Sequence, residues 1–214
     1  MKIYRHEHVL RVQHYYGPLL EAFYGSYELE EHLLLLSEKL WQGIQEKNPL
    51  VAIELSNYHP DLLGQKWEEI SGRDLNQEDA QRCILAQYGF NDWEECKELK
   101  YDIGFETLVN YVLWGKLEAI KQLLTNNPEL ISQKSSYGHQ ASILHYCASN
   151  GLELWRQQVP TNLPEITEYL LAHGADKSVK MKVYGGEFTP LPLLESSAHP
   201  FAAGVGERMK VLLS

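Results

Sequence analysis

Cysteine is scarce in this chain, and the cysteines present are not spaced as a disulfide framework would require. The 214 residues contain three of them, Cys83, Cys96 and Cys147. An odd number at wide spacing excludes a small scaffold held together by disulfides. Cys83 and Cys147 fall within apolar helical patterns, so we expect both to be small core residues rather than reactive thiols.

Long apolar runs and positive charge are also in short supply. The longest apolar runs, such as Leu33 to Leu36, are far too short for a bilayer. The first eight residues, Met1 to His8, lack the apolar segment of a signal peptide. The net charge of −10 argues against nucleic acid or an anionic membrane as the main partner. We therefore expect a cytoplasmic protein whose acidic surface keeps it in solution.

Motifs for phosphate binding and nucleophilic catalysis are missing as well. The chain has no Walker loop and no G-x-G-x-x-G sequence. Ser196, Ser197 and His199 lack the strand, turn and helix context of a hydrolase elbow. His145 and Cys147 stand two residues apart, so on a helix they point to different sides and cannot form a thiol–imidazole pair. We expect a protein that is not an enzyme and needs no cofactor.

The N-terminal histidines are the one group that suggests a metal site. His6, Glu7, His8 and His14 offer side chains that suit zinc or related ions. His6 and His8 would share a face only on a strand. No further Cys or His is spaced to complete a known site, so we favour the interpretation without a metal ion.

The residues present in the N-terminal half predict helices. Leu29, Leu33, Leu36, Leu40 and Ile44 recur at steps of three and four, which predicts a helix over 27–47. The pattern over 1–16 fits a strand or an irregular helix. Further starts are predicted at Asn48-Pro49, Trp67 (to Ile70), Asn76 (to Gly89) and Asp92-x-x-Glu95 (to about Lys100).

From Phe105 the pattern changes to pairs of short helices. The apolar segment Leu108–Gly115 recurs as Leu144–Gly151, 36 residues further on. Ser142 suits the N-cap of the second segment, and His145 lies three residues beyond it. A third segment opens at Thr189-Pro190-Leu191, with residues 152–164 inserted before it. Trp114 is expected in the core.

These motifs resemble ankyrin repeats. Ser142-Ile143-Leu144-His145-Tyr146-Cys147-Ala148 is similar to the pattern T-P-L-H-x-A, and the ending His173-Gly174-Ala175-Asp176 is similar to L-L-x-x-G-A-D. The stretch from Asp79 to Trp93 looks like a segment that precedes such repeats in uncharacterised bacterial proteins. The resemblance implies an all-α fold with three irregular repeats, at 103–136, 137–177 and 184–214. Because three repeats are marginal for stability, we expect residues 1–102 to form a helical cap on them within one continuous body.

The resemblance also implies a binding function. Such arrays hold partners through loop tips and the first helix of each repeat, where this chain has Tyr137, His139, Tyr146, Trp155 and Tyr184. Tyr and Trp are common in interface hot spots, although Trp155 could instead fill a gap between irregular repeats. We expect a protein partner. The alternative is a small-ligand or metal-binding protein, possibly an enzyme, with its site between the N-terminal helices and the first repeat.

Overall fold

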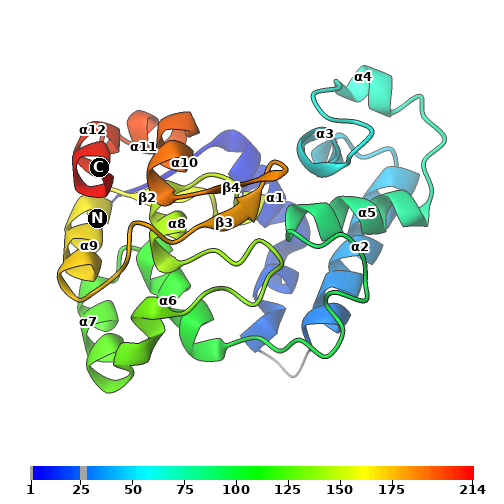
Figure 1. The fold of residues 1–214 in the computed structure, drawn as a ribbon. Helices are drawn as coiled ribbons and strands as arrows, with labels where there is room; N and C mark the ends of the chain where they lie inside the picture. The colour runs from blue at the N-terminus through cyan, green and yellow to red at the C-terminus, as the bar shows by residue number, and fades with distance from the viewer. Residues whose placement is uncertain (1, 25–27) are drawn as a thin grey trace. The chain divides into compact units, whose positions relative to one another are not determined.

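The chain divides into two compact units near residue 101. The computed structural model describes residues 2–24 and 28–214 (Figure 1). Glu7–Tyr101 form the N-terminal unit, and Asp102–Ser214 together with the residues up to His6 form the C-terminal unit. The division lies one residue from the expected boundary at 102/103, but the first residues belong with the C-terminal half. Helices account for 58% and strands for 7%, which places the chain in the all-α class.

Helices make up the N-terminal unit. In chain order they are α1 (Glu7–Tyr16), the 3-10 helix η1 (Gly17–Tyr24), α2 (Leu29–Gln45), the 3-10 helix η2 (Pro49–Val51), α3 (Ala52–Tyr58), α4 (Trp67–Ile70) and α5 (Gln77–Gln87). α2 packs against α5. Leu33, Leu36 and Leu40 of the predicted apolar stripe are all buried there. Inside α2, Gly43 allows close packing, because a Cβ at this position would lie 2.3 Å from Cγ1 of Val51.

Most starts predicted in this unit are confirmed, and one predicted helix is wrong. Asn48 and Asn76 cap η2 and α5 with their side chains, and α4 spans Trp67–Ile70 as expected. Tyr27, the predicted first residue of α2, lies outside the described residues. Residues 91–98 form bends and turns instead of a helix. Glu95 caps the backbone N–H of Asn91 at 2.9 Å, and this local bond does not extend into a helix.

The C-terminal unit combines helices with two small sheets. Its elements are β1 (Ile3–Arg5), α6 (Ile103–Leu113), α7 (Leu117–Asn126), η3 (Pro128–Ser132), α8 (Ile143–Ala148), η4 (Leu154–Arg156), β2 (Gln158–Pro160), α9 (Leu163–Ala172), β3 (Met181–Val183), β4 (Gly186–Phe188), α10 (Pro190–Ser196), α11 (His199–Ala202) and α12 (Gly206–Leu213). β1 pairs antiparallel with β2, and β3 pairs antiparallel with β4.

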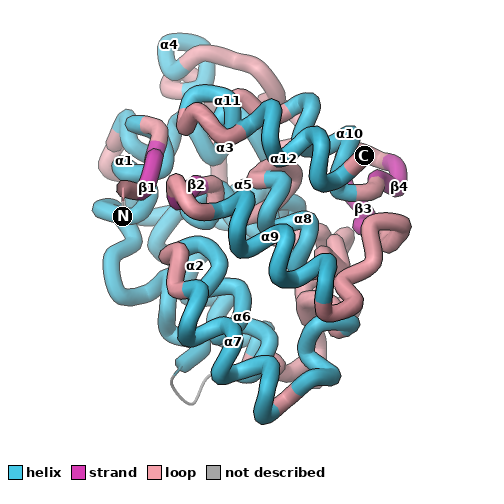
Figure 2. Tube along the Cα trace, turned by 90° about the vertical axis from the view of Figure 1, so that its left-hand side faces the viewer, coloured by secondary structure: helices cyan, strands magenta, loops and turns pink. Residues whose placement is uncertain are grey.

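The longer helices of the C-terminal unit form two rows. α8 contacts both α6 and α10, so these three make one row. Figures 1 and 2 show α7, α9 and α12 following one another along the other side. Each helix of the first row contacts one of the second, in the pairs α6–α7, α8–α9 and α10–α12. Their shared core includes Leu144, Ile166 and Leu194, all fully buried.

The structure of this unit differs in places from what the sequence predicts. α8 ends at Ala148, where Ser149 takes the left-handed conformation (φ 58°), so the helix stops before the end of the apolar segment Leu144–Gly151. The inserted segment contains η4 and β2, and residues 151–160 are all buried. His199-Pro200 begins the short helix α11. Trp114 is 39% exposed and stacks against Arg5 instead of lying in the core.

Candidate functional site

Ser142 and His145 form a local cap at the start of α8. Nδ1 of His145 accepts the backbone N–H of Ser142 at 3.0 Å, which leaves the proton of the neutral ring on Nε2. Nε2 then donates to the carbonyl of Phe188, 3.0 Å away at the end of β4. Burial lowers the pKa of His145 to about 4, so the ring stays neutral. This histidine therefore joins α8 to the β3–β4 hairpin.

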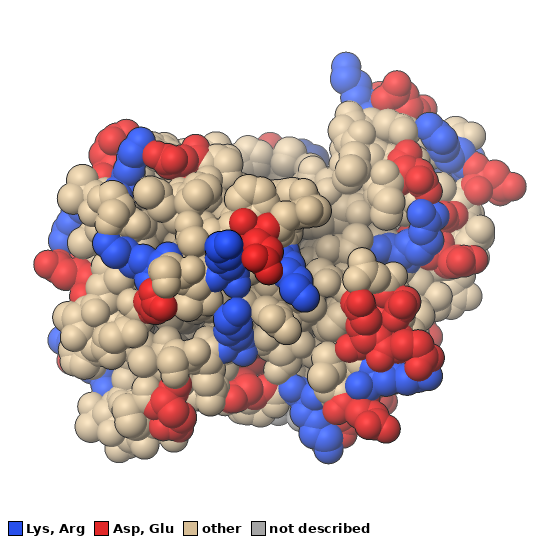
Figure 3. Space-filling model, in the orientation of Figure 1, with Lys and Arg blue, Asp and Glu red and all other residues tan. Residues whose placement is uncertain are grey.

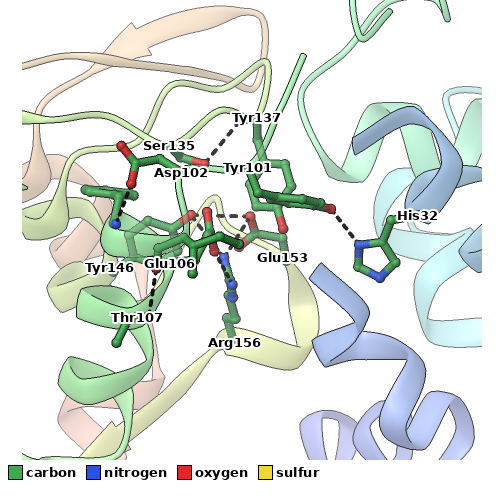
Figure 4. Close-up of polar contacts among 12 residues, drawn as sticks. His32, Tyr101, Asp102, Glu106, Thr107, Ser135, Tyr137, Tyr146, Glu153 and Arg156 are labelled. Atoms are coloured by element: carbon green, nitrogen blue, oxygen red, sulfur yellow. Dashed lines mark hydrogen bonds and ion pairs between the residues drawn. The ribbon is translucent and has the colours of Figure 1, made fainter. Parts of the chain in front are cut away.

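A buried charge network lies between α6 and the inserted segment (Figure 4). Nη2 of Arg156 contacts Oε2 of Glu106 at 2.5 Å, and Nη1 lies 3.7 Å from Oε1 of Glu153. The same Glu153 oxygen is 3.1 Å from Nε2 of His139 and 3.3 Å from the Tyr146 hydroxyl. Each of these five residues is at most 1% exposed. We refer to Glu106, His139, Tyr146, Glu153 and Arg156 as the Arg156 network.

The two carboxylates of the network differ in their pKa. Burial raises the pKa of Glu106 despite the nearby guanidinium. Burial alone would also raise the pKa of Glu153, but Arg156 and the hydrogen bond from His139 outweigh it and lower the value. Nδ1 of His139 accepts the backbone N–H of Ala141 at 3.1 Å, so Nε2 is the nitrogen that donates to Glu153. The network is a closed structural core, because its side chains are not exposed to a substrate.

Four of the five expected partner-binding residues lie in or around this network. Tyr146 and His139 belong to it. The Tyr137 and Trp155 rings face the guanidinium, with centroids 5.7 Å and 4.5 Å from Cζ of Arg156. All four are at most 6% exposed. The structure therefore brings these four side chains together around a buried cation and leaves none of them exposed, and for Trp155 an interior position is one of the two interpretations of the sequence.

Arg156, Glu106 and Glu153 were missed from the sequence. A signal was available in Glu153-Leu154-Trp155-Arg156, where opposite charges stand three residues apart between apolar and aromatic side chains. Such a pair usually lies on a solvated surface. The segment becomes part of a buried network only because Glu106, 50 residues earlier in the chain, contacts Arg156.

Tyr184 is the expected contact residue that is exposed. It occupies the β3–β4 turn, where Val183 pairs with Gly186 and Tyr184 and Gly185 form the two-residue loop. Both have positive φ, 53° and 71°, as a type I′ turn requires. The Tyr184 side chain is 68% exposed, and its hydroxyl donates to Oδ1 of Asn150 at 3.0 Å. The ring is therefore held in place without being buried.

Lysine side chains lie along β3, the strand that leads into this turn. Lys134, Lys180 and Lys182 are exposed, and Figure 3 shows basic side chains over β3 and β4 with acidic groups beside them. Nζ of Lys134 donates to the carbonyl of Lys180 at 3.3 Å, which places Lys134 at the start of β3. We define Lys134, Lys180, Lys182 and Tyr184 as the hairpin surface.

The N-terminal unit holds a second buried carboxyl group and a shallow pocket. Oε2 of Glu54 accepts the Tyr16 hydroxyl at 2.7 Å, and burial raises the pKa of Glu54 to about 7. Glu54 is 2% exposed, so it too is closed to solvent. The pocket, about 180 Å³ in volume, is lined by Trp41 and Trp67 among others. In the same unit, His32 bonds the Tyr101 hydroxyl at 2.5 Å (Figure 4).

The N-terminal histidines are divided between the two units. His6 belongs to the C-terminal unit, where its ring packs edge-on against His199, with centroids 5.8 Å apart. His8 and His14 belong to α1 of the N-terminal unit. Within residues 2–24 and 28–214, no three His, Cys, Asp or Glu side chains are grouped to hold a metal ion. None of the helices there has both the length and the apolar character needed to cross a membrane.

Comparison with known proteins adds no relative to this description. Neither a protein-family model, nor a curated protein, nor a solved structure matches the chain. The hairpin surface and the helices that carry it are the features of the molecule that point to a function.

Proposed function

We propose that this chain is a non-enzymatic interaction module built on ankyrin-type repeats, and that it acts in the cytoplasm on a protein partner. The observation that carries the proposal is the equivalence of two helix starts. Ser142 and Thr189 are the N-caps of α8 and α10, which are neighbours in one row. Each is preceded by antiparallel pairing, the Lys134–Ser142 bridge and the β3–β4 hairpin. This repetition supports the resemblance seen in the sequence.

Because the Arg156 network is closed to solvent, we place the proposed binding site on the surface of the molecule. A group that solvent cannot reach gives no route for substrate binding, whereas the hairpin surface presents an ordered aromatic ring. Tyrosine gives a large contact area at a low cost in conformational entropy, and for this reason it is common in interfaces.

Site-specific crosslinking tests this function. A photoreactive phenylalanine analogue at position 184, expressed in the source cell, should capture a discrete protein. The matched control carries the analogue at Val211, which is 74% exposed on α12 of the same unit. The proposal fails if position 184 yields no adduct, or if both positions yield the same ones.

A further inference from the structure

The hairpin surface carries positive charge on an acidic chain. Residues 177–187 contain three lysines and one glutamate, whereas the whole chain has 29 acidic and 19 basic residues. The one acidic side chain, Glu187, lies 3.7 Å from Nζ of Lys180, and both side chains are 58% exposed. An exposed pair of this kind is weak. Within the described residues, no carboxylate lies at ion-pair distance from Lys134 or Lys182.

Contacts with the backbone hold the three lysines of the hairpin surface, Lys134, Lys180 and Lys182, at β3. The Lys134 ammonium is held at the Lys180 carbonyl. The backbone N–H of Lys182 donates to the carbonyl of His139 at 2.9 Å, which ties β3 to the loop that leads into α8. Lys182 itself stands two residues before Tyr184. A ligand that contacts the Tyr184 ring is therefore within reach of a positive charge.

The conformation of Tyr184 is costly for the fold and useful for a contact. A non-glycine residue at φ 53° is strained, and an exposed ring recovers little of that cost by burial. Asn150 positions the hydroxyl and also ties the turn to α10, since its side-chain nitrogen lies 2.6 Å from Oγ of Ser196. A ring whose hydroxyl is already hydrogen-bonded to Asn150 has less conformational freedom to lose on binding.

We propose that the hairpin surface binds an acidic protein segment whose apolar side chain packs on Tyr184. This inference rests on the proposed interaction function and names the chemistry of its partner. Lysine ammonium groups along the strand that leads to an aromatic ring complement a segment that carries carboxylates beside an apolar side chain. A nucleic acid fits less well, because binding a phosphate backbone calls for a larger basic footprint than three lysines on a chain of net charge −10.

Fluorescence anisotropy with designed peptides tests the inference. The probe is a labelled peptide of glutamate residues around one phenylalanine, and the comparison peptide replaces every glutamate by glutamine. The full chain should bind the acidic peptide at least about tenfold more tightly at low salt, and added sodium chloride should remove the difference. The double variant Lys134→Glu/Lys182→Glu should lose about tenfold in affinity, and so should Tyr184→Ala.

The control variant is Lys116→Glu, which reverses an exposed lysine at the start of α7 in the same unit. It should bind like the unmodified chain. Equal loss in this control, equal affinity for both peptides, or equal binding of single-stranded DNA would each overturn the inference. Crosslinking at position 184 separates the two proposals. A captured partner with a neutral contact segment would leave the interaction function standing and refute the acidic partner.

Discussion

Buried ionisable side chains divide into those that are charged and those kept neutral by their surroundings. Glu54 is held between the Tyr16 hydroxyl and the core of the N-terminal unit. His145 is held between a backbone donor and a backbone acceptor in the C-terminal unit. Both have a pKa that burial shifts in favour of the neutral form. Their contributions to stability therefore depend on pH in opposite directions.

Replacing Glu54 by glutamine should stabilise the chain at high pH. The pKa of Glu54 is about 7 in the folded chain, against an ordinary value of 4.5. The folded state thus binds more protons between these values, and stability falls as pH rises from 4.5 to 7. At pH 8, Glu54→Gln should unfold with a free energy higher by on the order of 3 kcal/mol, and near pH 4 the difference should vanish. Urea denaturation across this range measures it.

Exposed Glu68 supplies the control for this experiment. Glu68→Gln should change the free energy of unfolding by less than about 0.5 kcal/mol at either pH. If the Glu54→Gln variant is no more stable than the unmodified chain at pH 8, the cost of burying the charged Glu54 carboxylate is offset by its surroundings.

Replacing His145 should remove a loss of stability in acid. The pKa of this ring is lowered to about 4 in the folded chain from an ordinary value of 6.5. The unfolded chain therefore takes up the proton first, and stability falls as pH drops from 6.5 to 4. His145→Asn should be less stable at pH 7, because the hydrogen bond to Phe188 is lost. The difference in the free energy of unfolding between the unmodified chain and this variant should decrease by on the order of 3 kcal/mol by pH 4.

The exposed His173 provides the comparison, since His173→Asn leaves the α8 cap intact. Urea denaturation of both variants at several pH values gives the free energies. If the difference in the free energy of unfolding between His145→Asn and the unmodified chain stays constant from pH 7 to pH 4, His145 does not titrate as its burial requires.

Secondary-structure elements are joined in the C-terminal unit by charge as well as by apolar packing. Arg156 links η4 to α6 through Glu106, and Glu153 of the same inserted segment adds His139 and Tyr146. The cost of burying a guanidinium is offset only while its partners remain. The network should therefore respond to substitutions as one group.

Arg156→Met should destabilise the chain by about 3–5 kcal/mol, because Glu106 and Glu153 would face each other without a buried cation. Adding Glu106→Gln should recover part of that loss, since one of the two carboxylates is then removed. Chemical denaturation of the two single variants and the double variant completes the cycle. Strictly additive effects would contradict a coupled network.

The exposed ion pairs of α9 and α12 offer a matched comparison. Arg208 lies 2.7 Å from Glu165, with side chains about half exposed. Arg208→Met should cost less than about 1 kcal/mol, because solvent screens the pair. A cost similar to that of Arg156→Met would show that burial is not what makes Arg156 important.

Helix starts were predicted correctly where a side chain near the start caps the backbone, as at Asn76 and Ser142. The prediction failed at residues 91–98, where the bonds of Glu95 form but no packed helix follows. Helix ends were predicted less accurately than helix starts. Ser149, not Gly151, takes the left-handed position after α8, although Gly151 also has a positive φ of 70°.

The chain as a whole is not divided in sequence order, since its first residues belong with its last half. β1 pairs with β2, so that Tyr4 lies opposite Val159, and the N–H of Thr161 donates to the carbonyl of Lys2 at 2.9 Å. Val159 is fully buried. A single short strand from the N-terminus thus completes the inserted segment that holds the Arg156 network.

Removing residues 2–6 should weaken the C-terminal unit. β2 would lose its partner strand, and the N–H of Thr161 would lose its acceptor. We expect backbone amides of residues 154–161 to exchange hydrogen faster in the shortened chain, while those of α5 in the N-terminal unit keep their protection. Mass spectrometry of deuterium uptake measures both. Unchanged uptake over 154–161 would show that β2 does not depend on β1.

Local sequence was enough to predict the helical class and most helix starts. These features depend on caps, periodicity and glycine, which act over a few residues. The ankyrin assignment stays a prediction. Tertiary structure decided that Tyr137, His139, Tyr146 and Trp155 face inward while Tyr184 does not. The physical reason is that Glu106 reaches Arg156 from 50 residues earlier in the chain and that β1 pairs with β2 from the N-terminus, and no local pattern records such long-range contacts.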